Sequence, residues 1–458
     1  MQESTGAEVN LFRQLAACLA TGRAIPDRGS EVGASDAKAI LEKLEYLPVD
    51  EKRPDQVRHR VALLEAAGRF TRVFQLESPD APGVTFFGAE LSAAGLDKAH
   101  LHQASSSASG AGLSLRQAFE SCIGEGVEYL SQFETAHDRL QEATIEHGLA
   151  DFDAASGEML AAFLRASTGP RSEKIDWIEA VQMSSGRPVR FPADLCLRRT
   201  AERSALVPPF SLSSGCAAGT TFEAAALHGM LELVERDAAS LWWRGGVRGR
   251  LVALEGGAVA TAAALVAHAR GATNTRRTWL LDITTDLDVP SIVAISSRVD
   301  GSGFACGLAA RPTLQNAARS ALMEMCQMEL AYDVVEAKRR EGGDQALNEY
   351  DRRHIARSTL VDTANCELLH PAAPARRVAG IIGQTPAQQL QALVERLSRN
   401  GIETFAIDLT RPAFGIPVAR IAAPALQAEP CEIATGRLAA ARNRTGGGDA
   451  YTRGISLL

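Results

Sequence analysis

The most constraining feature of this sequence is a spacing of acidic residues that occurs three times. Ala118, Ala225 and Ala317 each begin the pattern A-x6-E-x2-[E/Q], in which the polar residues follow after seven and ten positions. On an α-helix these two offsets lie on neighbouring rows of one face. Each copy therefore predicts a helix with its acids on one side: Glu125 and Glu128, then Glu232 and Glu235, then Glu324 and Gln327.

The surroundings of these acids favour a functional interpretation over a solvated helix face. The stretches are rich in apolar and small residues, as a buried helix would be, and carboxylates there are costly unless positive charge compensates them. Arg236 can offset one or two charges, whereas Glu125 and Glu128 have no basic neighbour in their stretch, AFESCIGEGVEYL. Several oxygen ligands without His or Cys favour Mg²⁺ over zinc or copper.

A segment of small residues precedes each acidic stretch, at 105–112, 213–219 and 301–307. We expect Gly/Ser-rich loops there, because such loops let backbone N–H groups approach phosphate oxygens at a helix N-terminus. Magnesium commonly shares its ligands with substrate phosphates, so the two features together favour a bound nucleotide. The chain has neither G-x-x-x-x-G-K-[ST] nor G-x-G-x-x-G after a strand, which argues against a Walker A site and the usual dinucleotide site.

A second repeat indicates paired strands. Asp282-Ile-Thr284 is followed by Pro290, and Asp408-Leu-Thr410 is followed by Pro417, each between two apolar runs. Asp and Thr can close a turn by hydrogen bonds to the backbone, while Pro is tolerated at the start of a strand. The repeat predicts a duplicated βαβ-like unit.

The pattern along the chain predicts three regions in a mixed α/β fold. Residues 1–70 read as a separable helical region of unknown role, in which Ser35 or Asp36 could cap the second helix. Residues 71–435 alternate strand-like runs, beginning with TRVFQLE and GVTFFGAEL, and Ala-rich helices. Residues 436–458 are rich in Arg and Gly, and we expect a loosely ordered C-terminal tail.

Composition and net charge indicate the cellular location of the protein and exclude some classes of partner. The formal charge of −7, from 48 basic and 55 acidic residues, argues against a nucleic-acid binder. No apolar run is long enough to span a bilayer and no signal peptide is recognisable, so we expect a cytoplasmic protein without a membrane partner. The eight scattered cysteines, with no C-x-x-C pair, predict buried and reduced thiols.

The segment 221–237, TFEAAALHGMLELVERD, resembles the E-x-x-E-R core motif of YcaO proteins. Other segments agree in order, among them IDW at 175–177, the two Asp-x-Thr segments and AARSALMEMCQ at 317–327, so that the resemblance covers roughly residues 70–430. It implies a YcaO-type fold of repeated strand–helix units with ATP and Mg²⁺ bound between them.

The resemblance also implies roles for individual residues. The implied metal ligands are Glu125, Glu128, Glu232, Glu235 and Glu324. The implied nucleotide contacts are Ser121, Arg236, Arg319, Gln327, Gly110 and Gly112, with Glu235 and Arg236 as the catalytic pair. An alternative role for Arg236 is an intrahelical pair with Glu232 at i, i+4.

Two positions depart from the family pattern. Many members carry Gly-Lys-Gly where this chain has Gly110-Ala111-Gly112, and many have Arg where Tyr129 stands. Both changes remove positive charge near the expected phosphates. We therefore expect ATP binding to survive these changes better than turnover.

The resemblance implies phosphorylation of a peptide amide oxygen, leading to an azoline or a thioamide in a ribosomally made peptide or protein. A different hypothesis is a nucleotide-binding, non-catalytic partner subunit or scaffold; a weaker one is an accessory factor for sulfur modification of a large cellular protein. Azoline-forming members typically end in a Pro-rich tail, whereas this chain has no Pro after Pro430. We therefore favour thioamidation or partner-dependent chemistry, with a partner protein that delivers substrate or sulfur; a homodimer stays open.

Overall fold

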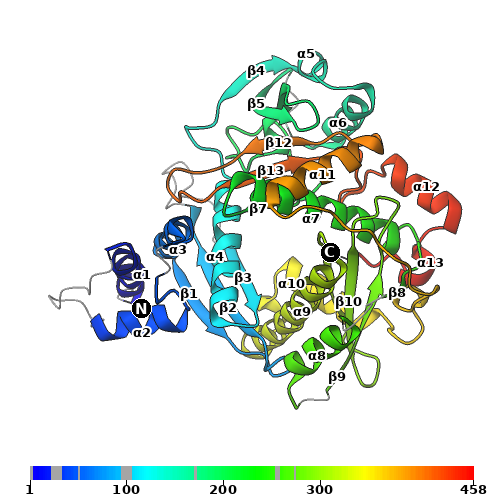
Figure 1. The fold of residues 1–458 in the computed structure, drawn as a ribbon. Helices are drawn as coiled ribbons and strands as arrows, with labels where there is room; N and C mark the ends of the chain where they lie inside the picture. The colour runs from blue at the N-terminus through cyan, green and yellow to red at the C-terminus, as the bar shows by residue number, and fades with distance from the viewer. Residues whose placement is uncertain are drawn as a thin grey trace.

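The N-terminal region is helical, as predicted. The computed structural model describes residues 4–21, 34–49, 52–93, 106–169, 173–252, 258–272 and 275–457. It begins with α1 (Ser4–Thr21), α2 (Ala34–Lys43) and α3 (Pro54–Ala67), of which α1 packs on α3 and α3 on α4 (Figure 1). Residues 35 and 36 lie inside α2, so the prediction that one of them caps this helix is wrong. In the first turn the Asp36 charge is favoured by the helix dipole instead.

The first strand–helix unit follows these helices. Strands β1 (Arg72–Leu76), β2 (Thr85–Leu91) and β3 (Ser106–Gly112) form an antiparallel sheet, and α4 (Leu115–Ser131) packs on β3 and β2. The two predicted strand-like runs are confirmed. Ser114 caps α4 by accepting a hydrogen bond from the backbone N–H of Gln117 (3.3 Å), which satisfies one orphan donor of the first turn.

The second unit has the same plan. Strands β9 (Arg276–Asp282), β10 (Ser291–Arg298) and β11 (Ala305–Ala310) are antiparallel, β8 (Arg250–Leu251) extends the sheet beyond β9, and α9 (Leu314–Gly342) packs on β11 and β10. Thr313 caps α9 as Ser114 caps α4.

The third unit is assembled from distant segments. Strand β12 (Phe405–Asp408) pairs with β13 (Val418–Ala422), and β13 pairs with β7 (Cys216–Ala218). Strand β7 leads through the cap residue Thr221 into α7 (Phe222–Trp243). The sheet continues beyond β12 into β5 (Lys174–Gln182), which carries β4 (Leu140–Thr144) and β6 (Pro188–Pro192). The sequence repeat is therefore a three-stranded antiparallel sheet followed by a capped helix.

The segments of small residues lead into or form strands, so their prediction as loops is wrong for part of each segment, while the approach of their backbone to phosphate stays a prediction. Residues 106–112, 216–218 and 305–310 are β3, β7 and β11, while Ser105 lies outside the described residues. Small residues are needed because each strand lies directly on its helix. A Cβ at Gly110 would come within 2.3 Å of the Cys122 nitrogen, and one at Gly307 within 2.2 Å of the Met325 nitrogen.

The two Asp-x-Thr segments close turns as predicted. The Asp282 carboxylate accepts from the Thr284 N–H (2.9 Å), and the Thr284 hydroxyl accepts from the Ser291 N–H (3.0 Å). Asp408, Thr410 and Val418 repeat this arrangement at 2.8 and 3.1 Å. The strands they join are antiparallel, however, so the predicted βαβ-like unit is wrong: connections 283–290 and 409–417 are too short for a crossover helix.

The C-terminal region is ordered, contrary to expectation. Residues 436–445 form α12 (Gly436–Thr445), in which Leu438 and Ala441 are buried against Leu241 of α7, and α13 (Asp449–Thr452) follows. Arg437 pairs with Asp237, which is 0% exposed. The remaining elements are α5 (Ile145–Leu149), α6 (Ala154–Ala166), η3 (Ala193–Leu195), α8 (Ala258–Arg270), η4 (Asp344–Ala346), α10 (Glu349–Leu360), η5 (Glu367–Leu369) and α11 (Pro386–Arg399).

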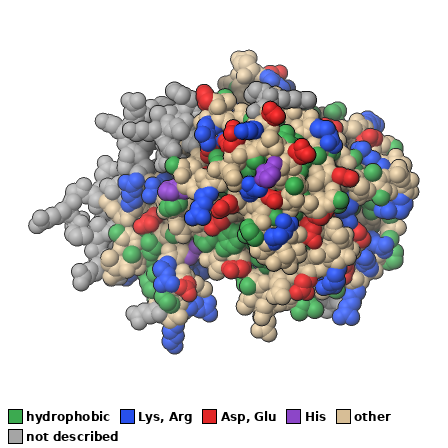
Figure 2. All heavy atoms as spheres, turned by 90° about the horizontal axis from the view of Figure 1, so that it is seen from above, with side chains coloured by type: hydrophobic (Ala, Val, Ile, Leu, Met, Phe, Trp, Pro, Cys, Tyr) green, Lys and Arg blue, Asp and Glu red, His purple; other side chains and the backbone are tan. Residues whose placement is uncertain are grey.

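The fold is the mixed α/β arrangement that the sequence predicts. The N-terminal helices share one hydrophobic core with the β1–β3 sheet and α4; the division at residues 70 and 435 stays a prediction. All eight cysteines are free and seven are buried, as expected. Among the described helices, none combines the length and apolar character needed to cross a membrane. Acidic and basic side chains are intermixed on the face shown in Figure 2.

Candidate functional site

The three acidic helices line one cavity, and each contributes a glutamate that is held in the same way. The Glu125 carboxylate accepts the backbone N–H of Ser109 (3.2 Å). Glu232 accepts that of Gly215 (3.0 Å), and Glu324 that of Leu308 (3.1 Å). Each donor lies in, or directly before, the strand that packs on the helix. The repeated unit thus fixes one carboxylate of every helix against its own sheet.

The negative charges of Glu125, Glu128, Glu232, Glu235 and Glu324, which are named the acidic cluster here, act on one another. Burial raises the pKa of Glu125 to about 7, and the charges of Glu324 and Glu232 raise it as well. The Glu125 side chain borders an open cavity, so it reaches water while protein crowds it on the other sides. Burial, Glu232 and Glu125 likewise raise the pKa of Glu128 well above its ordinary value. Carboxylates crowded in this way are suited to a bound cation, which would relieve their repulsion.

Glu235 and Glu324 join the cluster from α7 and α9. Burial raises the pKa of both, while the Arg236 charge opposes that rise. The Glu235 carboxylate also accepts the backbone N–H of Ala310 at the end of β11 (3.3 Å). Arg236 lies 3.3 Å from Glu232 and 3.4 Å from Glu235, so the intrahelical pair considered as its alternative role is present.

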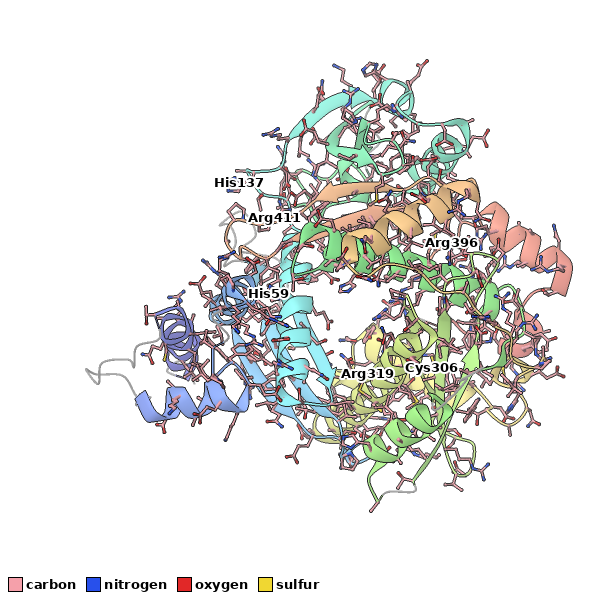
Figure 3. The ribbon with its side chains drawn as sticks, in the orientation of Figure 1. His59, His137, Cys306, Arg319, Arg396 and Arg411 are labelled. Atoms are coloured by element: carbon pink, nitrogen blue, oxygen red, sulfur yellow. The ribbon has the colours of Figure 1, made fainter. Side chains whose placement is uncertain are left out.

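A cavity of 730 Å³ lies beside the cluster, with walls from β3, α4, α7 and α9. Arg319 projects into the space between α4 and α9 (Figure 3) and donates a hydrogen bond to Gln117 (3.0 Å). The sequence-predicted residues on the wall are Gly112, Ser121, Glu125, Arg236, Arg319, Glu324 and Gln327. Ala111, at the position where many relatives have Lys, lies on the wall too.

Some predicted residues are not on this wall. Gly110 packs against the α4 backbone and is not among the residues that line the cavity, so its nucleotide contact stays a prediction. Glu128, Glu232 and Glu235 belong to the cluster without lining the cavity. Tyr129 lies under the guanidinium of Arg198, 4.9 Å from the ring centre.

Sequence reasoning missed several wall residues, of which Arg311 matters most. Arg311 follows β11 directly, and its positive charge opposes the rise that burial causes in the pKa of Glu235 and Glu324. The sequence feature that could have identified Arg311 is its position between the third segment of small residues (301–307) and Thr313, the N-cap residue of α9. The other missed wall residues with polar side chains are Ser109, Gln117, Ser213, Ser320 and Tyr350.

Within the described ranges, no three His, Cys, Asp or Glu side chains stand close enough together to hold a metal ion by themselves. Magnesium, however, is commonly bound through one or two carboxylates together with substrate phosphates and water. Glutamates from three helices beside a cavity with three arginines offer ligands of that kind.

Comparison with known proteins identifies relatives of this chain. An uncharacterized protein from the tfuA 3′ region of Rhizobium leguminosarum bv. trifolii is 27% identical over 270 residues, which cover 56% of this chain and 62% of the relative. The chain thus spans less than two thirds of that relative's length.

Two solved structures show the same fold. A heterocyclase in complex with substrate and cofactor matches with a TM-score of 0.62 and 22% identity, over 84% of this chain and 54% of the heterocyclase. The YcaO protein of Methanopyrus kandleri, bound with AMPPCP and Mg²⁺, matches with a TM-score of 0.56 and 19% identity, over 82% of this chain and 91% of that protein.

The family itself is shown by the sequence. Residues 109–427, which include all three acidic helices, match the family model for YcaO cyclodehydratases, ATP- and Mg²⁺-binding. The match covers well over half of the chain. This protein therefore belongs to the YcaO cyclodehydratase family, whose members bind ATP and Mg²⁺.

Proposed function

We propose that this chain is an enzyme that uses ATP and Mg²⁺ to phosphorylate the oxygen of a peptide amide. The observation that carries the proposal is the convergence of three acidic helices on a cavity lined by Arg236, Arg311 and Arg319. Carboxylates that hold metal ions and guanidinium groups that hold phosphates are the parts that phosphoryl transfer requires.

We assign the roles as follows. Glu125, Glu128, Glu232, Glu235 and Glu324 hold the metal ions, whose charge would offset that of the phosphates. Arg236, together with Arg311 and Arg319, binds phosphate oxygens. The remaining nucleotide contacts come from Ser121, Gln327 and Gly112 on the cavity wall.

The chemistry explains why such a site needs no protein nucleophile. A Cys, Ser or Thr side chain, or external sulfide, can add to an amide carbonyl, but the adduct collapses back because the oxygen is a poor leaving group. Phosphorylation lets that oxygen leave as phosphate, so the protein contributes positioning and electrostatic stabilisation. Addition of a side chain gives an azoline, and addition of sulfide gives a thioamide.

Among these products, the proposal favours a thioamide, or an azoline made only with a partner protein. The Rhizobium relative comes from the 3′ region of another gene, tfuA, which supports a partner encoded nearby. The substrate we propose is a ribosomally made peptide or protein.

One observation favours the non-catalytic alternative. Ala111 lies on the cavity wall at a position where many family members carry Lys, so this wall lacks one cation. A chain that binds nucleotide without turning it over would act as a partner subunit or scaffold of a modifying complex.

Mass spectrometry separates these possibilities. The purified chain is incubated with ATP, Mg²⁺ and a Cys/Ser/Thr-rich peptide encoded by a neighbouring gene, with and without sulfide or the protein encoded beside it. Replacement of oxygen by sulfur, only with sulfide or the partner present, would support the proposal. Loss of one water per site with the purified chain alone would refute the preferred product. If separate assays show that the chain binds ATP but does not hydrolyse it under any of these conditions, the result would favour the non-catalytic scaffold.

A further inference from the structure

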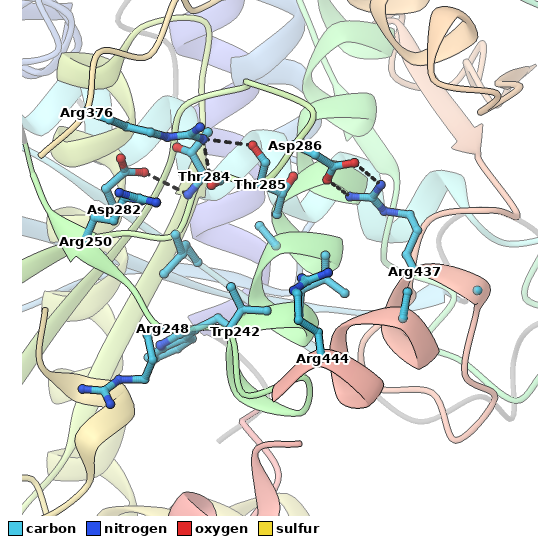
Figure 4. A pocket seen from close by; sticks show the side chains of 16 residues that line it. Trp242, Arg248, Arg250, Asp282, Thr284, Thr285, Asp286, Arg376, Arg437 and Arg444 are labelled. Atoms are coloured by element: carbon cyan, nitrogen blue, oxygen red, sulfur yellow. Dashed lines mark hydrogen bonds and ion pairs between the residues drawn. The ribbon is translucent and has the colours of Figure 1, made fainter. Parts of the chain in front are cut away.

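A second cavity, of 530 Å³, lies where α7 ends, beside β8 and the turn after β9 (Figure 4). Helix α12 closes one side of it. Its described lining residues include none that line the cavity beside the glutamates. α7 links the two sites, because Glu235 lies in the acidic cluster and Trp242, two turns further on, lines the second cavity.

The charge of this second cavity is strongly unbalanced. Five arginines line it, against the two aspartates Asp282 and Asp286. Two of the arginines are held in ion pairs: Arg437 by Asp237 (2.9 Å) and Asp286 (2.7 Å), and Arg248 by Glu367 (2.5 Å). The arginines that remain are Arg250, Arg376 and Arg444.

Among the described lining residues, one acid, Asp282, remains to face these three arginines. Asp282 acts on Arg250 and Arg376 only beyond ion-pair distance, and its carboxylate already accepts the Thr284 N–H. Arg376 donates to the carbonyl oxygens of Thr284 and Thr285, at 3.0 Å each, which fixes its guanidinium at the edge of the cavity. Within the described ranges, Arg444 has no acidic side chain at ion-pair distance. As far as the described side chains show, the positive charge of the cavity is therefore not neutralised.

The base of the cavity is apolar. Ala238, Leu241 and Trp242 come from α7, and the Trp242 indole is fixed by its N–H bond to the Leu368 carbonyl (2.9 Å). Sites for small ligands combine such an apolar wall with a few polar groups that fix orientation, and guanidinium groups match the geometry of phosphate and carboxylate.

We propose that this cavity binds a small organic oxyanion, a phosphate or carboxylate on a compact apolar group, separately from the nucleotide. The apolar part lies against Trp242 and Leu241, and the oxyanion is held by Arg250, Arg376 and Arg444. The proposal goes beyond the amide-activating function and does not depend on it.

Calorimetric titration of the full-length chain with phenyl phosphate, and separately with benzoate, tests the proposal. Arg250 and Arg444 are exposed and hold no ion pair in the described structure, so the double variant Arg250→Gln/Arg444→Gln should fold normally, with an unchanged melting temperature. The control is Arg377→Gln, which removes one positive charge, by the same type of substitution, from an exposed residue beside Arg376 that does not line the cavity. A further double variant, Arg236→Gln/Arg319→Gln, removes two arginines from the cavity beside the glutamates, so a loss of affinity in it would mean that the probe binds there.

We expect one saturable site whose affinity falls at least about tenfold in Arg250→Gln/Arg444→Gln and is unchanged in the other two variants. Tighter binding of phenyl phosphate identifies a phosphate ligand, and tighter binding of benzoate a carboxylate. Absence of saturable binding of both probes to the wild type would overturn the proposal. So would binding that Arg250→Gln/Arg444→Gln retains, or that only Arg236→Gln/Arg319→Gln removes.

Discussion

Replacing Gly110 by alanine tests whether close packing of β3 on α4 positions the glutamates. A Cβ at this position would lie 2.3 Å from the Cys122 nitrogen and 2.4 Å from the Ala118 carbonyl oxygen. Both atoms belong to the α4 backbone, which cannot rotate away as a side chain would. Strand β3 would have to move off α4 by about 1 Å to reach an ordinary contact distance.

The cost follows from these contacts. Overpacking alone costs about 1–3 kcal/mol, and the displaced Ser109 N–H would also lose its hydrogen bond to Glu125, worth about 1 kcal/mol or more. We expect Gly110→Ala to lower the free energy of unfolding by about 3 kcal/mol, measured by urea denaturation followed by circular dichroism.

Gly124→Ala is the matched control on the same helix. Among the described residues, no atom beyond the chain neighbours of Gly124 and the adjoining helix backbone lies within 4 Å of the added Cβ, and alanine is favoured over glycine inside a helix by about 1 kcal/mol. This variant should therefore be as stable as the wild type or more so. A Gly110→Ala protein within about 1 kcal/mol of the wild type would refute the role given to this packing.

Three further predictions address other parts of the molecule. Arg437→Ala leaves the fully buried Asp237 without its ion pair and should cost about 3–5 kcal/mol in a denaturation experiment; a loss below about 1 kcal/mol would contradict the pairing. Burial lowers the pKa of His354 to about 4, so the unfolded state binds more protons at this side chain, and the contribution of His354 to stability should fall by about 1.6 kcal/mol from pH 6.5 to pH 5. His354→Phe should remove this dependence, and an equal slope in the variant would exclude His354 as its cause. Ala111→Lys restores a cation on the cavity wall and should keep or raise the ATPase rate; a clear decrease would contradict the placement of phosphate there.

Sequence patterns predicted correctly those turns and helices that depend on interactions between residues close in sequence. The Asp-x-Thr turns could be recognised because Asp282 and Thr284 bond to backbone groups a few residues away. The acidic helices could be recognised because i, i+7 and i+10 share a face whatever surrounds the helix. The charges of Glu232 and Glu324 act on Glu125 because the tertiary structure brings the three helices to one site. In the sequence, only the repetition of the pattern indicated this.

The errors arose where a contact partner is distant in sequence. The segment ending at Gly110-Ala111-Gly112 reads as a turn from its residues alone, whereas its small side chains serve close contact with α4. The antiparallel third unit joins β7 to β13, about 200 residues away, and no local pattern contains that pairing. The C-terminal helix α12 likewise depends on Asp237 and Leu241 of α7, which its own Arg- and Gly-rich sequence does not reveal.

The most direct test of the central claim is calorimetric titration with AMPPCP, with and without Mg²⁺. The wild type should bind only with Mg²⁺ present, whereas Glu235→Gln and Arg236→Ala should lower the affinity by about a hundredfold, because each loses a charged contact to the ion or the phosphates. Glu223→Gln is the matched control, since Glu223 is exposed in the first turn of the same helix and lies outside the cluster. Unchanged affinity in both Glu235→Gln and Arg236→Ala, or equal binding without Mg²⁺, would contradict the assignment of this site.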